Sequence, residues 1–326
     1  MKKTFLYFCL LFIVQTAFAA DSLYVREQQI PILIDRIDNV LYEMRIPAQK
    51  GDVLNEITIQ IGDNVDLSDI QAIRLFYSGV EAPSRKGEHF SPVTYISSHI
   101  PGNTRKALES YSVRQDEVTA PLSRTVKLTS KQPMLKGINY FWVSIQMKPE
   151  TSLLAKVATT MPNAQINNKP IDITWKGKVD ERHVGIGVRQ AGDDGSAAFR
   201  IPGLVTTNNG TLLGVYDIRY NSSVDLQEKI DIGVSRSTDK GQTWEPMRVA
   251  MTFKQTDGLP HGQNGVGDPS ILVDEKTNTI WVVAAWTHGM GNERAWWNSM
   301  PGMTPDETAQ LMLVKSEDDG KTWSEP

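Results

Sequence analysis

An eight-residue motif occurs twice in the second half of this 326-residue chain and constrains its fold more than any other feature. The shared order is Ser-x-Asp-x-Gly-x-Thr-Trp, and the two copies begin at Ser237 and Ser316. Repetition of one short unit is typical of propellers and arrays, in which each unit buries its apolar face against its neighbours. The second half is therefore expected to consist of repeated sheets.

The residue types in this motif fit a tight turn between two strands. The Ser hydroxyl and the Asp carboxylate can bond backbone N–H groups, the Gly permits a positive φ, and the Trp ring can pack between sheets. Each copy follows an apolar strand, at 231–236 and 311–315, so it should connect the third and fourth strands of a unit. The positions assigned to structure are Ser237, Asp239, Gly241, Trp244, Ser316, Asp318, Gly320 and Trp323.

Apolar and polar residues alternate along several segments of the first half, which predicts strands with one buried face. The clearest runs lie at 57–61, 73–77 and 141–147. The pattern weakens between Pro149 and Asp180, and the domain boundary is expected near Gly177, within ten residues either way. These patterns predict an all-β protein whose residues 21–178 form a β-sandwich-like domain ahead of a second domain at 179–326.

The N-terminus has the order of a secretory signal peptide. Lys2 and Lys3 precede an apolar run at 5–14, and the small residues Ala17, Ala19 and Ala20 follow it. Residues 1–20 are therefore expected to be removed, and the single cysteine, Cys9, would leave with them. This predicts export to the periplasm or cell surface of a Gram-negative bacterium, with no integral membrane segment after cleavage.

Composition argues against several classes of ligand. The formal net charge of −4 disfavours nucleic acid as a partner. His183, His261 and His288 lack the spacing of metal ligands, so neither a metal nor another cofactor is expected. An anionic small ligand remains compatible with this charge, because a few arginines gathered in one cleft dominate the local field.

The repeated octapeptide resembles the Asp-box, or BNR repeat, of the bacterial exo-α-sialidases (neuraminidases). The sequence Phe199-Arg200-Ile201-Pro202 resembles the signature that opens their catalytic domain. The resemblance implies a six-bladed β-propeller, of which this chain would supply the first blades. It also implies a β-sandwich of the kind that several bacterial members carry ahead of the propeller, often described as carbohydrate-binding.

The same resemblance implies roles for five residues. Arg200 would belong to the arginine triad that grips the sugar carboxylate, since a guanidinium can form two parallel hydrogen bonds to it. Asp225 would be the acid/base residue, and Arg219 would lie close to the bound sugar. Asp268 would contact the sugar near its N-acyl group, and Trp286 would help to form an apolar pocket for the acetyl methyl.

The implied activity is hydrolysis of terminal α-linked sialic acids from glycans, glycoproteins or gangliosides, with retention of configuration. A tyrosine nucleophile, activated by a glutamate, would come from later blades. Because the chain ends just after the second motif, it is expected to be an N-terminal part of a larger protein and inactive alone.

The sequence is also compatible with two proteins that are not enzymes. A sialoglycan-binding lectin without catalysis would also keep Arg200, and Asp-boxes occur in purely structural propellers. Asp217 and Asp231 are rival acid/base candidates, although their positions in strands favour structural roles.

Overall fold

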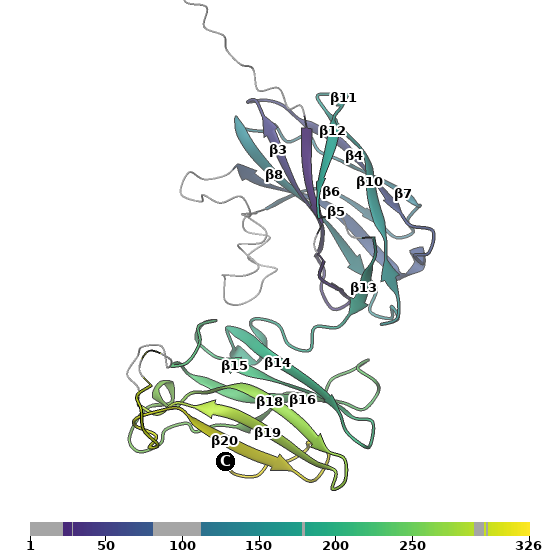
Figure 1. Ribbon diagram of the computed structural model, residues 1–326. Helices are drawn as coiled ribbons and strands as arrows, with labels where there is room; N and C mark the ends of the chain where they lie inside the picture. The colour runs from purple at the N-terminus through teal and green to yellow at the C-terminus, as the bar shows by residue number, and fades with distance from the viewer. Residues whose placement is uncertain (1–21, 28, 81–111, 178–179, 290–296, 298) are drawn as a thin grey trace, which may run out of the picture.

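The structure is a computed structural model, and it describes residues 22–27, 29–80, 112–177, 180–289, 297 and 299–326. Each regular element longer than three residues in these ranges is a β-strand, which confirms the all-β class. Figure 1 shows two groups of sheets that follow each other along the chain. The expected signal peptide and Cys9 lie outside the described residues. Within the described ranges, no helix has the length and apolar character needed to cross a membrane.

The first group contains two sheets that pack face to face. The larger sheet has the strand order β12 (Asp172–Lys176), β1 (Ser22–Glu27), β3 (Asn39–Ala48), β8 (Gly137–Met147), β5 (Ile70–Val80) and β6 (Val113–Thr119). The smaller sheet has the order β11 (Lys169–Pro170), β10 (Thr159–Ile166), β4 (Leu54–Ile61) and β7 (Thr125–Thr129). Short 3-10 helices lie at Leu67–Asp69, Asp193–Gly195 and His261–Gln263.

The core of this sandwich comes from the alternating residues that the sequence pattern singles out. Ile57, Ile59 and Ile61 of β4 are fully buried against inward-facing side chains of β5 and β8, among them Leu75 and Val143. Removing such a side chain from water is worth about 1.5–3 kcal/mol. The N-terminal fold therefore follows from the period-two pattern that predicted it.

The chain remains with the first group for some residues after its last long strand. β13 (Arg182–Gly185) pairs with β2 (Ile32–Leu33) and β9 (Lys156–Val157), and the Arg182 guanidinium donates to the Val40 carbonyl at 2.9 Å. The passage to the second group therefore lies between Gly185 and Ala198. β13 itself is too short to produce a sequence pattern.

The second group consists of two antiparallel sheets. The first has the order β14 (Ala198–Thr206), β15 (Leu212–Arg219), β16 (Ile230–Ser237) and β17 (Arg248–Met251). The second has the order β18 (Val266–Asp274), β19 (Thr279–Trp286) and β20 (Gln310–Ser316). Leu213, Val215, Val282 and Val314 belong to one apolar cluster that both sheets share. The sheets are thus stacked as neighbouring units, as a propeller requires.

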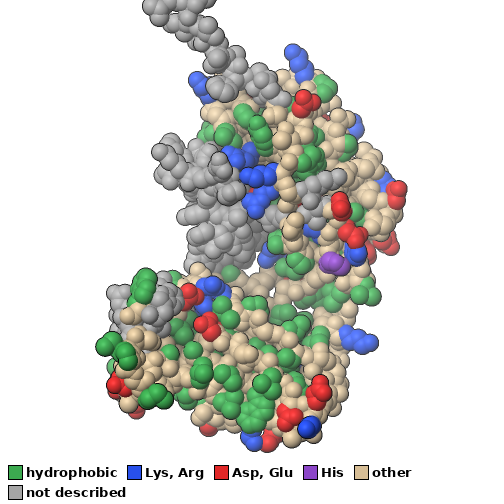
Figure 2. Space-filling view, viewed as in Figure 1, with side chains coloured by type: hydrophobic (Ala, Val, Ile, Leu, Met, Phe, Trp, Pro, Cys, Tyr) green, Lys and Arg blue, Asp and Glu red, His purple; other side chains and the backbone are tan. Residues whose placement is uncertain are grey.

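The outer side of the second unit is apolar and exposed. Leu311 and Leu313 of β20 are 81% and 44% exposed. Met312 and Val314 alternate with them and pack in the cluster that both sheets share. Figure 2 shows apolar side chains gathered on this lower group of sheets.

Each repeated motif forms a turn closed by its own side chains. Ser237 accepts the Gly241 N–H through Oγ at 2.8 Å and donates to Asp239 at 2.8 Å. The Asp239 carboxylate accepts the N–H and hydroxyl of Thr243 at 2.9 and 2.6 Å, and Gly241 has φ +86°. The second copy repeats these contacts with Ser316, Asp318, Gly320 and Thr322.

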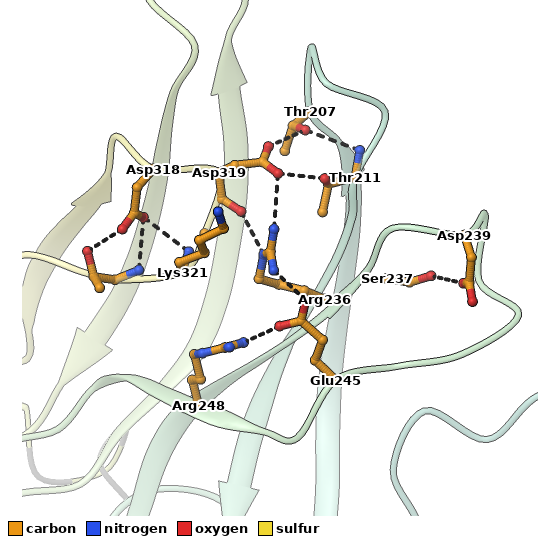
Figure 3. A network of polar contacts seen from close by, with 12 residues as sticks. Thr207, Thr211, Arg236, Ser237, Asp239, Glu245, Arg248, Asp318, Asp319 and Lys321 are labelled. Carbon is orange, nitrogen blue, oxygen red and sulfur yellow. Dashed lines mark hydrogen bonds and ion pairs between the residues drawn. The ribbon is translucent and has the colours of Figure 1, made fainter.

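Asp319 of the second motif ties the two units together (Figure 3). Its carboxylate accepts the hydroxyls of Thr207 and Thr211, each at 2.6 Å, and the Arg236 guanidinium at 3.1 Å. Arg236 also donates to the Asp319 carbonyl at 2.8 Å. Burial raises the pKa of Asp319, but these hydrogen bonds outweigh it and leave the pKa below its usual value. Lys240 holds the same position in the first motif and is exposed.

Replacing Asp319 by alanine should destabilise the chain by about 1–3 kcal/mol, because it leaves Arg236 and two threonine hydroxyls with fewer partners at a buried boundary. Lys240→Ala is the matched control, since both residues have positive φ at the same motif position. That control should change the free energy of unfolding by less than about 0.5 kcal/mol. Urea unfolding at pH 7 measures both, and equal midpoints for the two variants would contradict the inter-unit tie.

The motif aspartates should also make stability depend on acid. The Thr243 hydroxyl and N–H, with Ser237, hold the pKa of Asp239 at about 2. Burial raises the pKa of Asp318, but bonds from Thr322 and Ser316 outweigh it and leave the value at about 2. Folded values below the unfolded ones give stability that is present above about pH 4 and lost as the pH falls toward 2.

Thermal unfolding between pH 5 and pH 2 tests this dependence. The double variant Asp239→Asn, Asp318→Asn should show a shallower fall of the midpoint between pH 4 and pH 2 than the parent chain. An unchanged slope would mean that these turns do not respond to protonation.

Candidate active site

β14 and β18 are the first strands of the two sheets in the second group, and both have a bulge near their N-terminal ends. The pairing of β14 with β15 shifts register between Arg200 and Gly203, and that of β18 with β19 shifts between Gly267 and Ser270. A proline, which cannot donate to the ladder, lies in each bulge, and the residue before it has positive φ: +53° at Ile201 and +56° at Asp268.

The bulges show which positions of the two units correspond. They align Asp268 with Ile201, and they align Arg200 with Gly267. Two residues one position apart on a strand point to opposite faces, so the two units present different side chains at this end.

Arg200, Arg219 and Asp225 come together at the ends of β14 and β15. Arg200 donates through Nη1 to Asp225 Oδ1 at 2.8 Å and to the Ser223 carbonyl at 3.0 Å. Arg219 donates through Nη1 to the same two oxygens, at 2.6 and 3.0 Å. The Arg200 and Asp225 side chains are 43% and 42% exposed, whereas Arg219 is 1% exposed. One guanidinium is thus buried beneath the carboxylate and the other stands at the surface beside it.

Asp217 lies on the same face of β15 as Arg219 and is fully buried. Its Oδ2 accepts Nε and Nη2 of Arg219 at 3.0 and 2.7 Å, and its Oδ1 accepts the Asp268 N–H at 2.9 Å. Burial raises the pKa of Asp217 to about 6, with the Arg219 bonds and charge and the Asp268 N–H opposing that rise. At neutral pH this carboxylate therefore remains an anion between the two units.

The segment that carries Asp225 is also anchored to the second unit. The buried Gln227 side chain donates to the Thr287 carbonyl at 3.3 Å and accepts the Thr287 hydroxyl. Leu226 packs beside Gly265, where an added Cβ would approach the Leu226 side chain to 2.8 Å and the Glu228 carbonyl oxygen to 2.2 Å. The close passage of these chains therefore requires glycine at position 265.

Asp231, a rival acid/base candidate, has a different environment. Its side chain is 5% exposed, its Oδ2 accepts the Tyr220 hydroxyl at 3.0 Å, and its Oδ1 lies 2.8 Å from Nε2 of His261. Asp217, the other rival, is buried as described. Of the three carboxylates weighed for this role, Asp225 is the one that faces solvent.

The other two predicted site residues, Asp268 and Trp286, differ in exposure and in their contacts. Asp268 is exposed at the start of β18, and its backbone bond to Asp217 brings it to the arginine cluster. Trp286 is buried and stacks on Phe253 with ring centroids 4.4 Å apart and planes 10° apart. Its indole therefore takes part in the packing of the unit, and its contribution to a sugar pocket stays a prediction.

The sequence does not assign two participants to this cluster. It offers Asp217 only as a rival acid/base candidate, although Asp217 and Arg219 alternate on one strand and must share a face. Gln227 offered no signal, since its partner Thr287 comes from another unit.

Chemically, the cluster offers a solvent-facing guanidinium for an anionic ligand and a nearby carboxyl group for proton transfer. The buried ion pair of Asp217 and Arg219 holds the carboxyl group from beneath.

Comparisons with known proteins agree with both groups of sheets. Residues 20–170 match the family model described as the N-terminal domain of BNR-repeat neuraminidase, and residues 201–326 match the BNR repeat-like domain. A sialidase of Bacteroides fragilis is 56% identical over 332 residues, an alignment that covers all of this chain and 61% of that protein. A sialidase of Paraclostridium sordellii is 36% identical over 127 residues, covering 39% of this chain and 29% of that protein.

A solved structure agrees as well. The Hadza microbial sialidase Hz136 superposes with a TM-score of 0.81 and 60% sequence identity, covering 93% of this chain and 58% of that one. The chain therefore spans about three fifths of the length of these two relatives. Both halves of the sequence, the fold and the relatives lead to one assignment. The chain belongs to the BNR-repeat sialidase family.

Proposed function

We propose that this chain is the N-terminal part of an exo-α-sialidase that hydrolyses terminal α-linked sialic acids from glycans, glycoproteins or gangliosides. The observation that carries the proposal is the joint placement of Arg200, Arg219 and Asp225, in which an exposed guanidinium stands next to an exposed carboxyl group. A structural propeller would not require such a cluster at its surface.

In the proposed reaction, Arg200 binds the carboxylate of the sugar. Its Nη1 donates to Asp225 Oδ1, so an incoming carboxylate would take the place of this oxygen on the guanidinium. Asp225, released from Arg200, takes up a proton from solvent and donates it to the leaving glycosidic oxygen. It afterwards accepts a proton from the attacking water, which returns it to the protonated acid. Arg219 remains in place, because Asp217 holds it from the buried side.

The nucleophile is assigned to a tyrosine of a later blade. The carboxylate on the anomeric carbon of sialic acid would repel an attacking carboxylate, which disfavours the usual pair of acids in glycosidases. A tyrosine activated by a glutamate avoids this repulsion and gives retention through a covalent intermediate.

Export remains part of the proposal and rests on the sequence of residues 1–20 alone. A position outside the cytoplasm would give the enzyme access to the glycans of other cells. The contribution of the β-sandwich to glycan binding is likewise a proposal without a site of its own.

Release of 4-methylumbelliferone from its α-sialoside tests the activity. The assay uses the protein at the length of its relatives, with Asp225→Ala and the 326-residue chain alongside. We expect turnover by the long protein and none from the 326-residue chain. For Asp225→Ala we expect kcat to fall at least 100-fold, because hydrolysis of the covalent intermediate needs the base even when an aryl leaving group does not need the acid. Glu228→Ala is the matched control, because it removes another carboxylate of the same loop, one that accepts from the Asn221 amide and the Lys229 N–H.

If the folded long protein binds sialic acid but shows no turnover, the enzyme assignment is wrong and the protein is a sialoglycan-binding lectin.

Arg200→Lys tests the carboxylate-binding role. Lysine keeps the charge but cannot form two parallel hydrogen bonds, so we expect KM to rise about 10- to 100-fold. Arg248→Lys is the control, since Arg248 is similarly exposed and pairs with Glu245 at 2.7 Å on the outer strand β17. Steady-state kinetics on the same substrate separate the two variants, and an equal KM for both would remove Arg200 from the binding site.

A further inference from the structure

We infer that Asp217 is a positioning residue that fixes the acid/base group Asp225 through Arg219 and locks this arrangement to the second unit. The inference rests on the proposed function, and it assigns a role to a residue that does not itself contact the substrate. Three observations carry it: the bonds of Asp217, its burial, and its location at the boundary between two units.

The bonds form a continuous chain from the interior to the surface. Asp217 Oδ2 accepts Nε and Nη2 of Arg219, and Arg219 Nη1 donates to Asp225 Oδ1 at 2.6 Å. Because Asp217 holds two nitrogens of a planar guanidinium, the direction of the third nitrogen is set. Arg219 also donates to the Ser223 carbonyl, so the loop backbone next to Asp225 is fixed by the same plane.

The other carboxylate oxygen of Asp217 bonds to the neighbouring unit. Its Oδ1 accepts the N–H of Asp268 at 2.9 Å, within the bulge where Asp268 adopts a positive φ of 56°. Gly267 lies beside this contact, where an added Cβ would be 3.4 Å from Asp217 Oδ2. One carboxylate thus sets the position of an arginine in one unit and a backbone turn in the next.

Burial explains why no other group can substitute. Asp217 and Arg219 are each 1% exposed, so water cannot replace either partner. In Asp217→Asn the single amide oxygen can serve Arg219 or the Asp268 N–H, but the amide NH₂ then faces the other donor. Arg219 would turn away, and Asp225 would lose a contact that defines its position.

A misplaced acid affects substrates according to their leaving groups. An alkyl leaving group, such as the lactose of sialyllactose, needs protonation by the acid, whereas 4-methylumbelliferone leaves with little help. A purely structural loss would lower both reactions equally. The ratio of kcat/KM for the two substrates therefore distinguishes positioning of Asp225 from general damage.

The test compares Asp217→Asn with the parent in the protein at the length of its relatives. We expect kcat/KM for sialyllactose to fall about 10- to 100-fold and that for the aryl sialoside less than about 5-fold. Asp319→Asn is the matched control, because Asp319 also pairs an arginine across the same boundary but at its opposite end. It should change both substrates by the same small factor.

A fall of equal size for both substrates, or values within about 3-fold of the parent for both, would overturn the inference. If Asp217→Asn does not fold, Asp217→Glu decides, because it keeps the charge but displaces the carboxylate by one methylene. If Asp217→Glu has the same ratio of kcat/KM for the two substrates as the parent, positioning is contradicted. A larger loss for sialyllactose than for the aryl sialoside would support it. Lack of turnover by the parent itself would refute the proposed function instead.

Discussion

The contact between the β14–β17 sheet and the β18–β20 sheet is the constraint on which the site depends. Its middle is apolar, with Leu213 and Val215 of β15 packed in a cluster shared by both sheets. The same face of β15 continues with Asp217 and Arg219, so one strand changes from hydrophobic packing to an ion pair. Apolar packing fixes the distance between the sheets, and this distance sets the positions of Asp217 and Arg219 at the polar end.

The two ends of this boundary carry carboxylates with different consequences. Asp319 bonds two hydroxyls and Arg236 beside the Asp-box turn, where no residue proposed for catalysis lies. Asp217 makes comparable bonds at the other end, where its partner Arg219 also holds Asp225. Buried ion pairs contribute little net stability when compared with apolar packing, but they fix orientation. Orientation matters at the end that holds the cluster.

Local patterns predicted much of the fold, and long-range contacts account for what they missed. The alternation at 57–61 and the repeated octapeptide each depend on neighbours in sequence, and they led to the sandwich and to stacked units. The pairing of β13 with β2 and β9 joins residues far apart in the chain, and its two- to four-residue strands are too short for periodicity. In the site, Arg200, Arg219 and Asp225 followed from family motifs. The strand position of Asp217 favours a structural role, and only the Asp268 N–H in the next unit reveals its second contact.

Arg200 and Arg219 share two acceptors but differ in what they can do. Both donate to Asp225 Oδ1 and to the Ser223 carbonyl, yet one side chain is 43% exposed and the other 1%. A guanidinium at the surface can exchange its partner for a ligand at small cost, because water can solvate the intermediate arrangement. A buried guanidinium cannot, because leaving its carboxylate would strand two charges in the interior. The cluster therefore has an exchangeable half, which suits binding, and a fixed half, which suits the holding of an acid.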